Sequence, residues 1–152
     1  MTATNHVLTG AVLAAVVKTP ALALPLAFLL HFALDMLPHY GHRDDEPPAK
    51  SYERLRSMLP IDAAVGAAIL ITIASIRPEH WLVMVLGGIL CASPDLMWIA
   101  KFVRHLRGKK AVAQTNWLMR FHHWIQWCER GWGAWVEAAW FVAFGWVLVQ
   151  FL

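Results

Sequence analysis

Three ionisable residues near the end of an apolar segment have the types and spacing of a metal site. His31 and Asp35 lie four residues apart, which places both side chains on one face of a helix. Pro38 disfavours helix at the residue before it, so the helix should end there and let His39 fold back toward Asp35. Imidazole and carboxylate groups are suitable ligands for Zn²⁺, Mn²⁺ or Fe²⁺. The spacing therefore predicts a divalent metal centre, with zinc as the first candidate and manganese or iron as alternatives.

The rest of the chain is unusually apolar. Of its 152 residues, 59% are of the AVILMFWYC types and only 15% are Asp, Glu, Lys or Arg, and the mean hydropathy is +0.49. A soluble domain is about 45–50% apolar and about 25% charged. This composition excludes a disordered chain and disfavours a water-soluble fold. The chain also has nine Trp and only two Tyr, which indicates a membrane protein because Trp collects at membrane–water interfaces. We expect one integral membrane domain over residues 1–152.

Hydropathy and length divide the chain into membrane helices. Four segments are long enough to span, at residues 21–37, 61–76, 81–100 and 134–152. The apolar stretch at residues 7–17 is short, so it is either a short spanning helix or a half-buried one. A cleaved signal peptide is disfavoured because no Lys or Arg precedes this stretch. The expected fold is all-α, a polytopic bundle of four to five transmembrane helices.

Residues 116–133 predict an interfacial amphipathic helix rather than a plain loop. Apolar residues recur there at helical spacing, at Trp117, Phe121, Trp124, Trp127 and Cys128. Between them, His122 and His123 are adjacent, so they cannot both face the same way on a helix. The Trp residues are equally consistent with an interfacial anchor that carries no chemistry.

Basic residues are distributed very unevenly. If the helices span, the connections at residues 38–60 and 101–133 lie on one side and carry four and seven Lys or Arg, 11 of the 13 in the chain. The positive-inside rule places that side in the cytoplasm, as expected for an integral protein of a prokaryotic inner membrane. The net charge is +3, but the basic residues flank apolar segments. Anionic lipid head groups are therefore the expected partners, and nucleic acid is not.

Other ligand-type residues are expected on the same side. His31 lies six residues before Leu37, and Asp95 lies six residues before Lys101, so both are about 9 Å below one surface. We therefore expect Asp95 and at least one of His122 and His123 to approach the His31–Asp35 pair closely enough to share a metal. The predicted metal ligands are His6, His31, Asp35, His39 and Asp95. The predicted acid–base residues are Asp62, His122 and His123.

Each of these residues also has an ordinary structural interpretation. Asp62 could cap a helix N-terminus. The Pro94-Asp95 pair could be a kink with an internally paired carboxylate, and His31 with Asp35 could form a hydrogen bond between helices. Cys91 and Cys128 lie in apolar surroundings without a Cys-x-x-Cys motif, which excludes a disulfide scaffold and disfavours a thiolate zinc site.

The N-terminal forty residues resemble a known family. Asn5-His6 with Gly10, followed by Leu30-His31-Phe32-Ala33-Leu34-Asp35 and Pro38-His39, resembles the predicted membrane-bound metal-dependent hydrolases, small prokaryotic inner-membrane proteins. Their recurrent marks are an early Thr-His and a later Ser-His-x-x-Leu-Asp, for which this chain has Asn5 and Leu30 in place of Thr and Ser. The resemblance implies a metal-binding role for His6, His31 and Asp35.

The leading functional hypothesis is metal-assisted hydrolysis of a phosphoester, in a lipid or lipid-linked substrate at the cytoplasmic leaflet. A bound divalent metal activates water and polarises a phosphoryl oxygen. The alternative is a non-enzymatic membrane protein that binds metal or handles ions. A transport path should have polar residues across the whole membrane, yet residues 63–73 and 81–88 carry nothing ionisable. A polar cluster that only ties helices together is a third possibility. Gly87-Gly88 would permit close helix packing, including packing in a homo-oligomer.

Overall fold

The computed structural model describes residues 1–41, 48–108 and 116–152, and over these ranges its regular secondary structure is entirely helical. The helices are α1 (Ala3–Val17), α2 (Pro20–Asp35), α3 (Pro48–Ile76), α4 (Trp81–Ala92), α5 (Leu96–Leu106), α6 (Trp117–Ile125) and α7 (Gly133–Val149). Two short 3-10 turns, η1 (Ser93–Asp95) and η2 (Gln126–Cys128), follow α4 and α6. The all-α prediction is confirmed.

Two helical stretches are long and apolar enough to cross a membrane. They are Arg56–Ile76, within α3, and Trp81–Arg104, which runs through α4, η1 and α5. Three further apolar helices, α1, α2 and α7, are shorter, at 15, 16 and 17 residues. Large apolar side chains such as Ile71, Leu82 and Val142 are exposed on the outside of the bundle. These features agree with a membrane protein, and the predicted number of four to five spanning helices stays a prediction.

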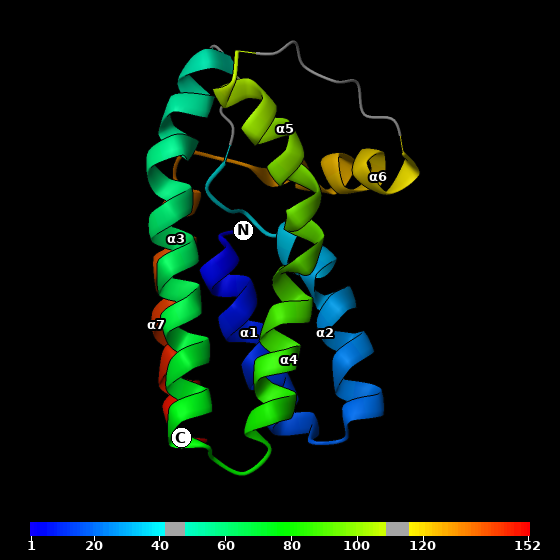
Figure 1. Cartoon of the computed structure of the whole chain (residues 1–152), viewed down its shortest axis with the longest axis vertical. Helices are drawn as coiled ribbons and strands as arrows, with labels where there is room; N and C mark the ends of the chain where they lie inside the picture. Colours follow the sequence, from blue (N-terminus) through cyan, green and yellow to red (C-terminus); the bar gives the residue numbers. More distant parts are fainter. Residues whose placement is uncertain (42–47, 109–115) are drawn as a thin grey trace.

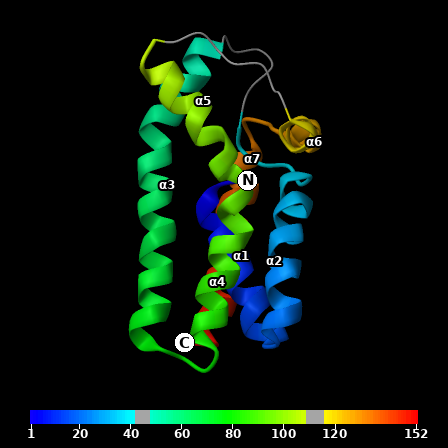
Figure 2. The ribbon, with the colours of Figure 1, turned by 45° about the vertical axis from the view of Figure 1, so that its right-hand side comes forward.

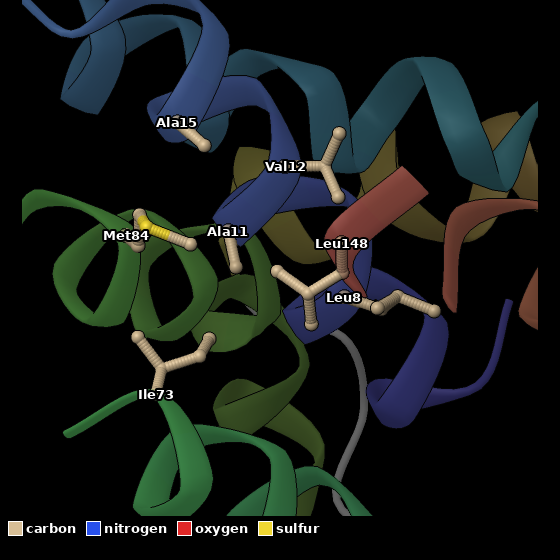
Figure 3. Packing of buried hydrophobic residues seen from close by; sticks show 7 residues of the cluster. All are labelled: Leu8, Ala11, Val12, Ala15, Ile73, Met84 and Leu148. Carbon is tan, nitrogen blue, oxygen red and sulfur yellow. The ribbon is translucent and has the colours of Figure 1, made fainter. Parts of the chain in front are cut away.

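The shortest predicted membrane segment forms the centre of the bundle. Helix α1 packs against α2, α3, α4 and α7, and most of its residues are buried. Figures 1 and 2 both show it among these four helices. A helix that is apolar on all sides is stable only when it is surrounded. Leu8, Ala11, Val12 and Ala15 of α1 meet residues of α3, α4 and α7 in one apolar cluster (Figure 3).

Small residues bring α1 and α4 into backbone contact. A Cβ atom added to Gly87 would lie 2.7 Å from the carbonyl oxygen of Gly10, so neither position has room for a side chain. Cys91 lies one helical turn beyond Gly87 on the same face of α4, and His6 lies one turn before Gly10 on α1. The close crossing therefore holds His6 against Cys91. The prediction that Gly87 permits close helix packing is confirmed within the chain.

Three predicted boundaries were wrong. Helix α3 begins at Pro48 rather than at residue 61, so Pro60 lies inside it. Its first half contains several good helix formers, and Pro48 is tolerated at a helix start, where its missing N–H has no intrahelical partner. Helix α2 ends at Asp35 rather than Leu37. The segment expected as one helix at residues 81–100 is interrupted by the 3-10 turn Ser93–Asp95, which contains Pro94.

The connections gather at the two ends of the bundle. Figure 1 shows the start of α3, the end of α5 and α6 at one end, opposite the α1–α2 and α3–α4 connections and the C-terminus. Helix α6 lies across the long direction of the bundle, and Trp117 and Trp124 on it are 75% and 69% exposed. The predicted amphipathic helix therefore exists, but it ends at Ile125, before the 3-10 turn, rather than at residue 133. Its location in a membrane interface stays a prediction.

Candidate metal centre

Four buried or half-buried side chains from three elements converge at this end of the bundle. His31 and Asp35 of α2, Asp95 of η1 and His122 of α6 bring ligand atoms within 4.8 Å of one another. We call these four residues the His–Asp cluster. The side chains of His31, Asp35 and His122 are fully buried, whereas that of Asp95 is 29% exposed. The predicted approach of Asp95 and one histidine of α6 to the His31–Asp35 pair is confirmed.

The local structure of each element explains the convergence. His31 and Asp35 occupy successive turns of α2, and His31 Nε2 lies 3.2 Å from Asp35 Oδ2. The 3-10 turn at Pro94 places Asp95 Oδ1 3.8 Å from His31 Nε2 and 3.6 Å from His122 Nε2. Zinc ligands lie about 2.0–2.2 Å from the ion, so two ligands of one ion are at most about 4.4 Å apart. The donor set and its spacing therefore fit a divalent cation.

The carboxylate of Asp35 is contacted by several groups at once. Its Oδ1 lies 2.6 Å from the amino nitrogen of Met1 and 3.0 Å from His6 Nε2. Its Oδ2 lies 2.9 Å from His122 Nε2 and 3.4 Å from the side-chain amide nitrogen of Gln126. A fully buried carboxylate needs such partners, because an uncompensated charge away from water is strongly destabilising.

The proton on His31 can be assigned from its hydrogen bond. His31 Nδ1 lies 2.8 Å from the backbone carbonyl oxygen of Cys91. Because a carbonyl oxygen can only accept, Nδ1 carries the proton, and neutral His31 presents the lone pair of Nε2 to the cluster. Metal-binding histidines characteristically donate their second ring N–H to a carbonyl or carboxylate in this way. His31 therefore has the arrangement of a metal ligand.

His122 has the opposite arrangement. The indole nitrogen of Trp98 lies 2.7 Å from His122 Nδ1, and because an indole N–H can only donate, Nδ1 is the acceptor. Neutral His122 therefore carries its proton on Nε2, 2.7 Å from His31 Nε2 and 2.9 Å from Asp35 Oδ2. A metal at His122 Nε2 would have to displace this proton. His122 is consequently better suited to hold and transfer a proton than to bind metal.

This pair of tautomers is testable in the metal-free protein. We expect ¹⁵N NMR of histidine-labelled protein to show a protonated Nδ1 in His31 and a protonated Nε2 in His122, with signals assigned by His31→Gln and His122→Gln. Trp98→Phe removes the indole donor, so the Nδ1 resonance of His122 should move toward that of an imidazole nitrogen without a hydrogen bond. The His31 signals should not move. A protonated Nδ1 in His122 of the unmodified protein would contradict the assignment.

His6 extends the cluster from α1. Its side chain is fully buried, its ring stacks on that of His31 with centroids 4.1 Å apart, and its Nε2 faces Asp35 Oδ1. Its Nδ1 lies 4.0 Å from Cys91 Sγ. Cys91 thus contacts His6 through its sulfur and His31 through its backbone carbonyl. The structure therefore places His6, one of the predicted metal ligands, beside the His–Asp cluster.

Two predicted residues lie in other surroundings. His39 Nδ1 donates to the carbonyl of Leu37 at 2.7 Å, and Nε2 lies 3.8 Å from Glu129 Oε1. Its backbone carbonyl accepts from Arg130 N at 2.9 Å, which fixes the segment against the chain after α6 rather than folding it toward Asp35 as predicted. His123, adjacent to the buried His122, is exposed. Neither belongs to the four-residue cluster.

Asp62 caps a helix, as its structural interpretation proposed, but the helix is α1. Its carboxylate oxygens accept from the backbone N–H groups of Ala3 at 2.8 Å and Thr4 at 2.9 Å. A carboxylate at a helix N-terminus satisfies free N–H groups and interacts favourably with the helix dipole. The structure thus gives Asp62 a positioning role, since it fixes the start of the helix that carries His6.

Several residues around the cluster carried no signal in the sequence. Trp98 and the carbonyl of Cys91 orient the histidines, and Gln126 contacts Asp35. Glu137 of α7 is buried and accepts from Thr2 N at 2.9 Å, Tyr40 N at 3.1 Å and the Asn5 side-chain amide at 3.2 Å. A carboxylate inside an apolar helix is a detectable signal. A backbone carbonyl, or one particular Trp among nine, gives no such signal in the sequence.

Comparison of the chain with protein-family models, with curated proteins and with solved structures found no match. The geometry of the site is therefore the basis for the functional conclusion.

Proposed function

We propose that this chain is a membrane-embedded, metal-dependent hydrolase that cleaves a phosphoester of a lipid or lipid-linked substrate. The observation that carries the proposal is the convergence of His31, Asp35, Asp95 and His122 in a chain whose surface is largely apolar. Ionisable groups inside apolar segments are costly and are kept where they have a function. The N-terminal resemblance to predicted membrane-bound metal-dependent hydrolases supports the same proposal.

The metal-binding residues proposed for the reaction are His31, Asp35 and Asp95, with His6 beside them. When bound, a divalent cation supplies an activated water and polarises a phosphoryl oxygen. Asp35 keeps the histidine rings in place through its contacts with them. Asp95 is the most exposed of the four residues in the cluster, so the substrate should approach from its side.

His122 is proposed to donate a hydrogen bond from Nε2 to the leaving oxygen, on which negative charge develops. Its Nε2 proton points into the cluster, and Trp98 fixes the ring through Nδ1. Such a donor must lie within hydrogen-bond distance of the reacting atoms, and the buried ring of His122 is held within hydrogen-bond distance of Asp35. Zinc is the proposed metal, with manganese and iron as alternatives, because histidine and carboxylate donors suit all three.

A lipid substrate is favoured by an apolar groove beside the cluster. The groove has a volume of about 230 Å³ and runs between α1, α3 and α4, with Val7, Gly66, Leu70 and Ile89 in its walls. Its lining also includes Ser93, the first residue of η1, which carries Asp95, and Leu96, the residue after η1. We assign this groove to an acyl chain of the substrate, whose phosphoester would then lie beside Asp95.

The orientation proposed for the protein follows from its basic residues. The end of the bundle with α6 contains most of the Lys and Arg, which attract anionic head groups, and exposed Trp side chains suit a membrane interface. We propose that this end faces the cytoplasm of a prokaryotic cell, with α1, α2 and α7 spanning the inner membrane beside α3 and α4.

Consumption of the phospholipid in mixed micelles tests the proposal. Detergent-purified protein is stripped of metal, reloaded with Zn²⁺ or Mn²⁺, and assayed with phosphatidic acid and phosphatidylglycerol in mixed micelles. We expect metal-dependent cleavage of one of these lipids. His122→Gln should lower kcat by about 10²–10³-fold, the usual contribution of one hydrogen-bond donor to a developing oxyanion.

The matched control is His123→Gln, the same change at the neighbouring exposed position, which should leave kcat unchanged. A metal-loaded protein that cleaves neither lipid would contradict hydrolysis and favour the non-enzymatic metal-binding alternative. Equal rates for His122→Gln and the unmodified protein would contradict the role of His122.

A further inference from the structure

The two carboxylates of the cluster each present their two oxygens to different histidines. Asp35 Oδ1 faces His6 Nε2 at 3.0 Å, while Asp35 Oδ2 faces His31 Nε2 at 3.2 Å. Asp95 repeats the division, with Oδ2 3.9 Å from His6 Nε2 and Oδ1 3.8 Å from His31 Nε2. The stacked rings of His6 and His31 therefore lie beside opposite oxygens of the same two carboxylates.

We propose that the centre holds two divalent cations bridged by Asp35 and Asp95, the second held by His6. One ion would take His31 Nε2, Asp35 Oδ2 and Asp95 Oδ1. The other would take His6 Nε2, Asp35 Oδ1 and Asp95 Oδ2. Each set is one imidazole and two carboxylate oxygens, a donor combination that suits zinc and manganese. The four histidine–carboxylate separations within the two sets fall between 3.0 and 3.9 Å, within the limit for ligands of one ion.

Charge at the second position supports this assignment. The amino nitrogen of Met1 lies 2.6 Å from Asp35 Oδ1, so a cationic group already lies beside the oxygen that faces His6. The two carboxylates supply two negative charges, which one divalent ion balances. With the Met1 ammonium included, two ions would give the centre an excess of three positive charges, which complements a phosphoester anion.

Cys91 contacts the Nδ1 atoms of both histidines, His31 and His6. Its backbone carbonyl accepts the Nδ1 proton of His31 at 2.8 Å, and its sulfur lies 4.0 Å from His6 Nδ1. A thioether or thiol sulfur is a weak acceptor, so it can receive an Nδ1 proton of His6 and leave Nε2 free for a metal. The same residue thus orients both proposed ligands toward the carboxylates.

The inference rests on the metal-binding part of the proposed function and adds the number of metal ions bound per chain. Two ions that share bridging ligands are the arrangement by which many phosphatases and nucleases stabilise both the attacking and the leaving oxygen. A one-ion centre would leave His6, a fully buried histidine at the middle of the bundle, without a role in binding.

Counting Mn²⁺ ions tests the inference without an activity assay. Metal-stripped full-length protein in detergent is equilibrated with Mn²⁺, the bound ions are counted by elemental analysis, and the EPR spectrum is recorded. We expect two Mn²⁺ per chain and the spectrum of a magnetically coupled pair. His6→Gln should retain one ion and show the spectrum of isolated Mn²⁺.

The matched control is His80→Gln, at the opposite end of the bundle, which should retain two coupled ions. One Mn²⁺ per chain with an uncoupled spectrum in the unmodified protein would overturn the inference, whether or not His6→Gln folds, and would leave hydrolysis by a single ion intact. Two coupled ions in a protein that cleaves neither phosphatidic acid nor phosphatidylglycerol would sustain the inference and contradict the proposed function.

Discussion

Replacing Asp35 by Asn is expected to weaken Zn²⁺ binding by well over 100-fold. Outer residues of metal sites already contribute about 10–100-fold to affinity, and Asp35 is a proposed direct ligand. Its carboxylate is contacted by His6, His31 and His122, so the change removes a charge from the middle of the cluster. The amide keeps the size of the side chain, which limits the disturbance of packing. Competition with a fluorescent zinc chelator measures the affinity in detergent.

Asp62→Asn is the matched control for this prediction. Asp62 is a carboxylate at the same end of the bundle, but it caps α1 through Ala3 and Thr4 and is not a member of the His–Asp cluster. Its substitution should cost roughly 1 kcal/mol of stability, as for other lost helix caps, and change zinc affinity little. Comparable losses of affinity in the two variants would argue against a metal held by Asp35.

Gly87→Leu should destabilise the bundle by about 3 kcal/mol or more. A Cβ atom at this position would lie 2.7 Å from the carbonyl oxygen of Gly10 and 2.8 Å from Cβ of Ala14, so α1 and α4 would have to separate. Forced overpacking of this kind typically costs about 1–3 kcal/mol, and a clash with backbone belongs at the upper end or above. Reversible unfolding in detergent by added SDS, followed by circular dichroism, measures the change in free energy.

Gly145→Leu is the same substitution in an open position. A Cβ atom on Gly145 of α7 meets nothing within 4 Å among the described residues, so the stability should change by less than about 0.5 kcal/mol. Gly87→Leu should also weaken zinc binding, because Cys91 one turn away orients His31. Equal stabilities for the two variants would mean that α1 and α4 do not cross in close contact.

The level of some polar residues along the bundle was predictable from the sequence. The rise per residue of a helix is fixed, so counting from the helix ends placed His31 and Asp95 at one level, and the structure brings them to the same cluster. The helical pattern of residues 116–133 likewise predicted α6 and required that only one of His122 and His123 face inward. These predictions depend on local periodicity, which a sequence records directly.

The partners that His39 and Asp62 find in distant segments were not predictable. His39 contacts Glu129 and Arg130 rather than Asp35 because its backbone joins the chain beyond α6, and nothing near His39 in the sequence specifies that partner. Asp62 was recognisable as a helix cap, but the capped helix is 58 residues away. The extension of α3 back to Pro48 was not predicted. The charged stretch before residue 61 has a proline at each end, which suggested a loop, although its residues are compatible with a helix.

The chain order of the cluster has a consequence for biosynthesis. His6, His31, Asp35 and Asp95 are all synthesised before His122, and the helix that carries His122 lies across the end of a bundle whose other members precede it, except for α7. A ribosome that has released only the first hundred residues into the membrane has supplied every proposed ligand but not the proton-carrying histidine. On the proposed function, a nascent chain could therefore bind its metal before His122 is in place, and the segment after residue 116 would add the part of the site needed for catalysis.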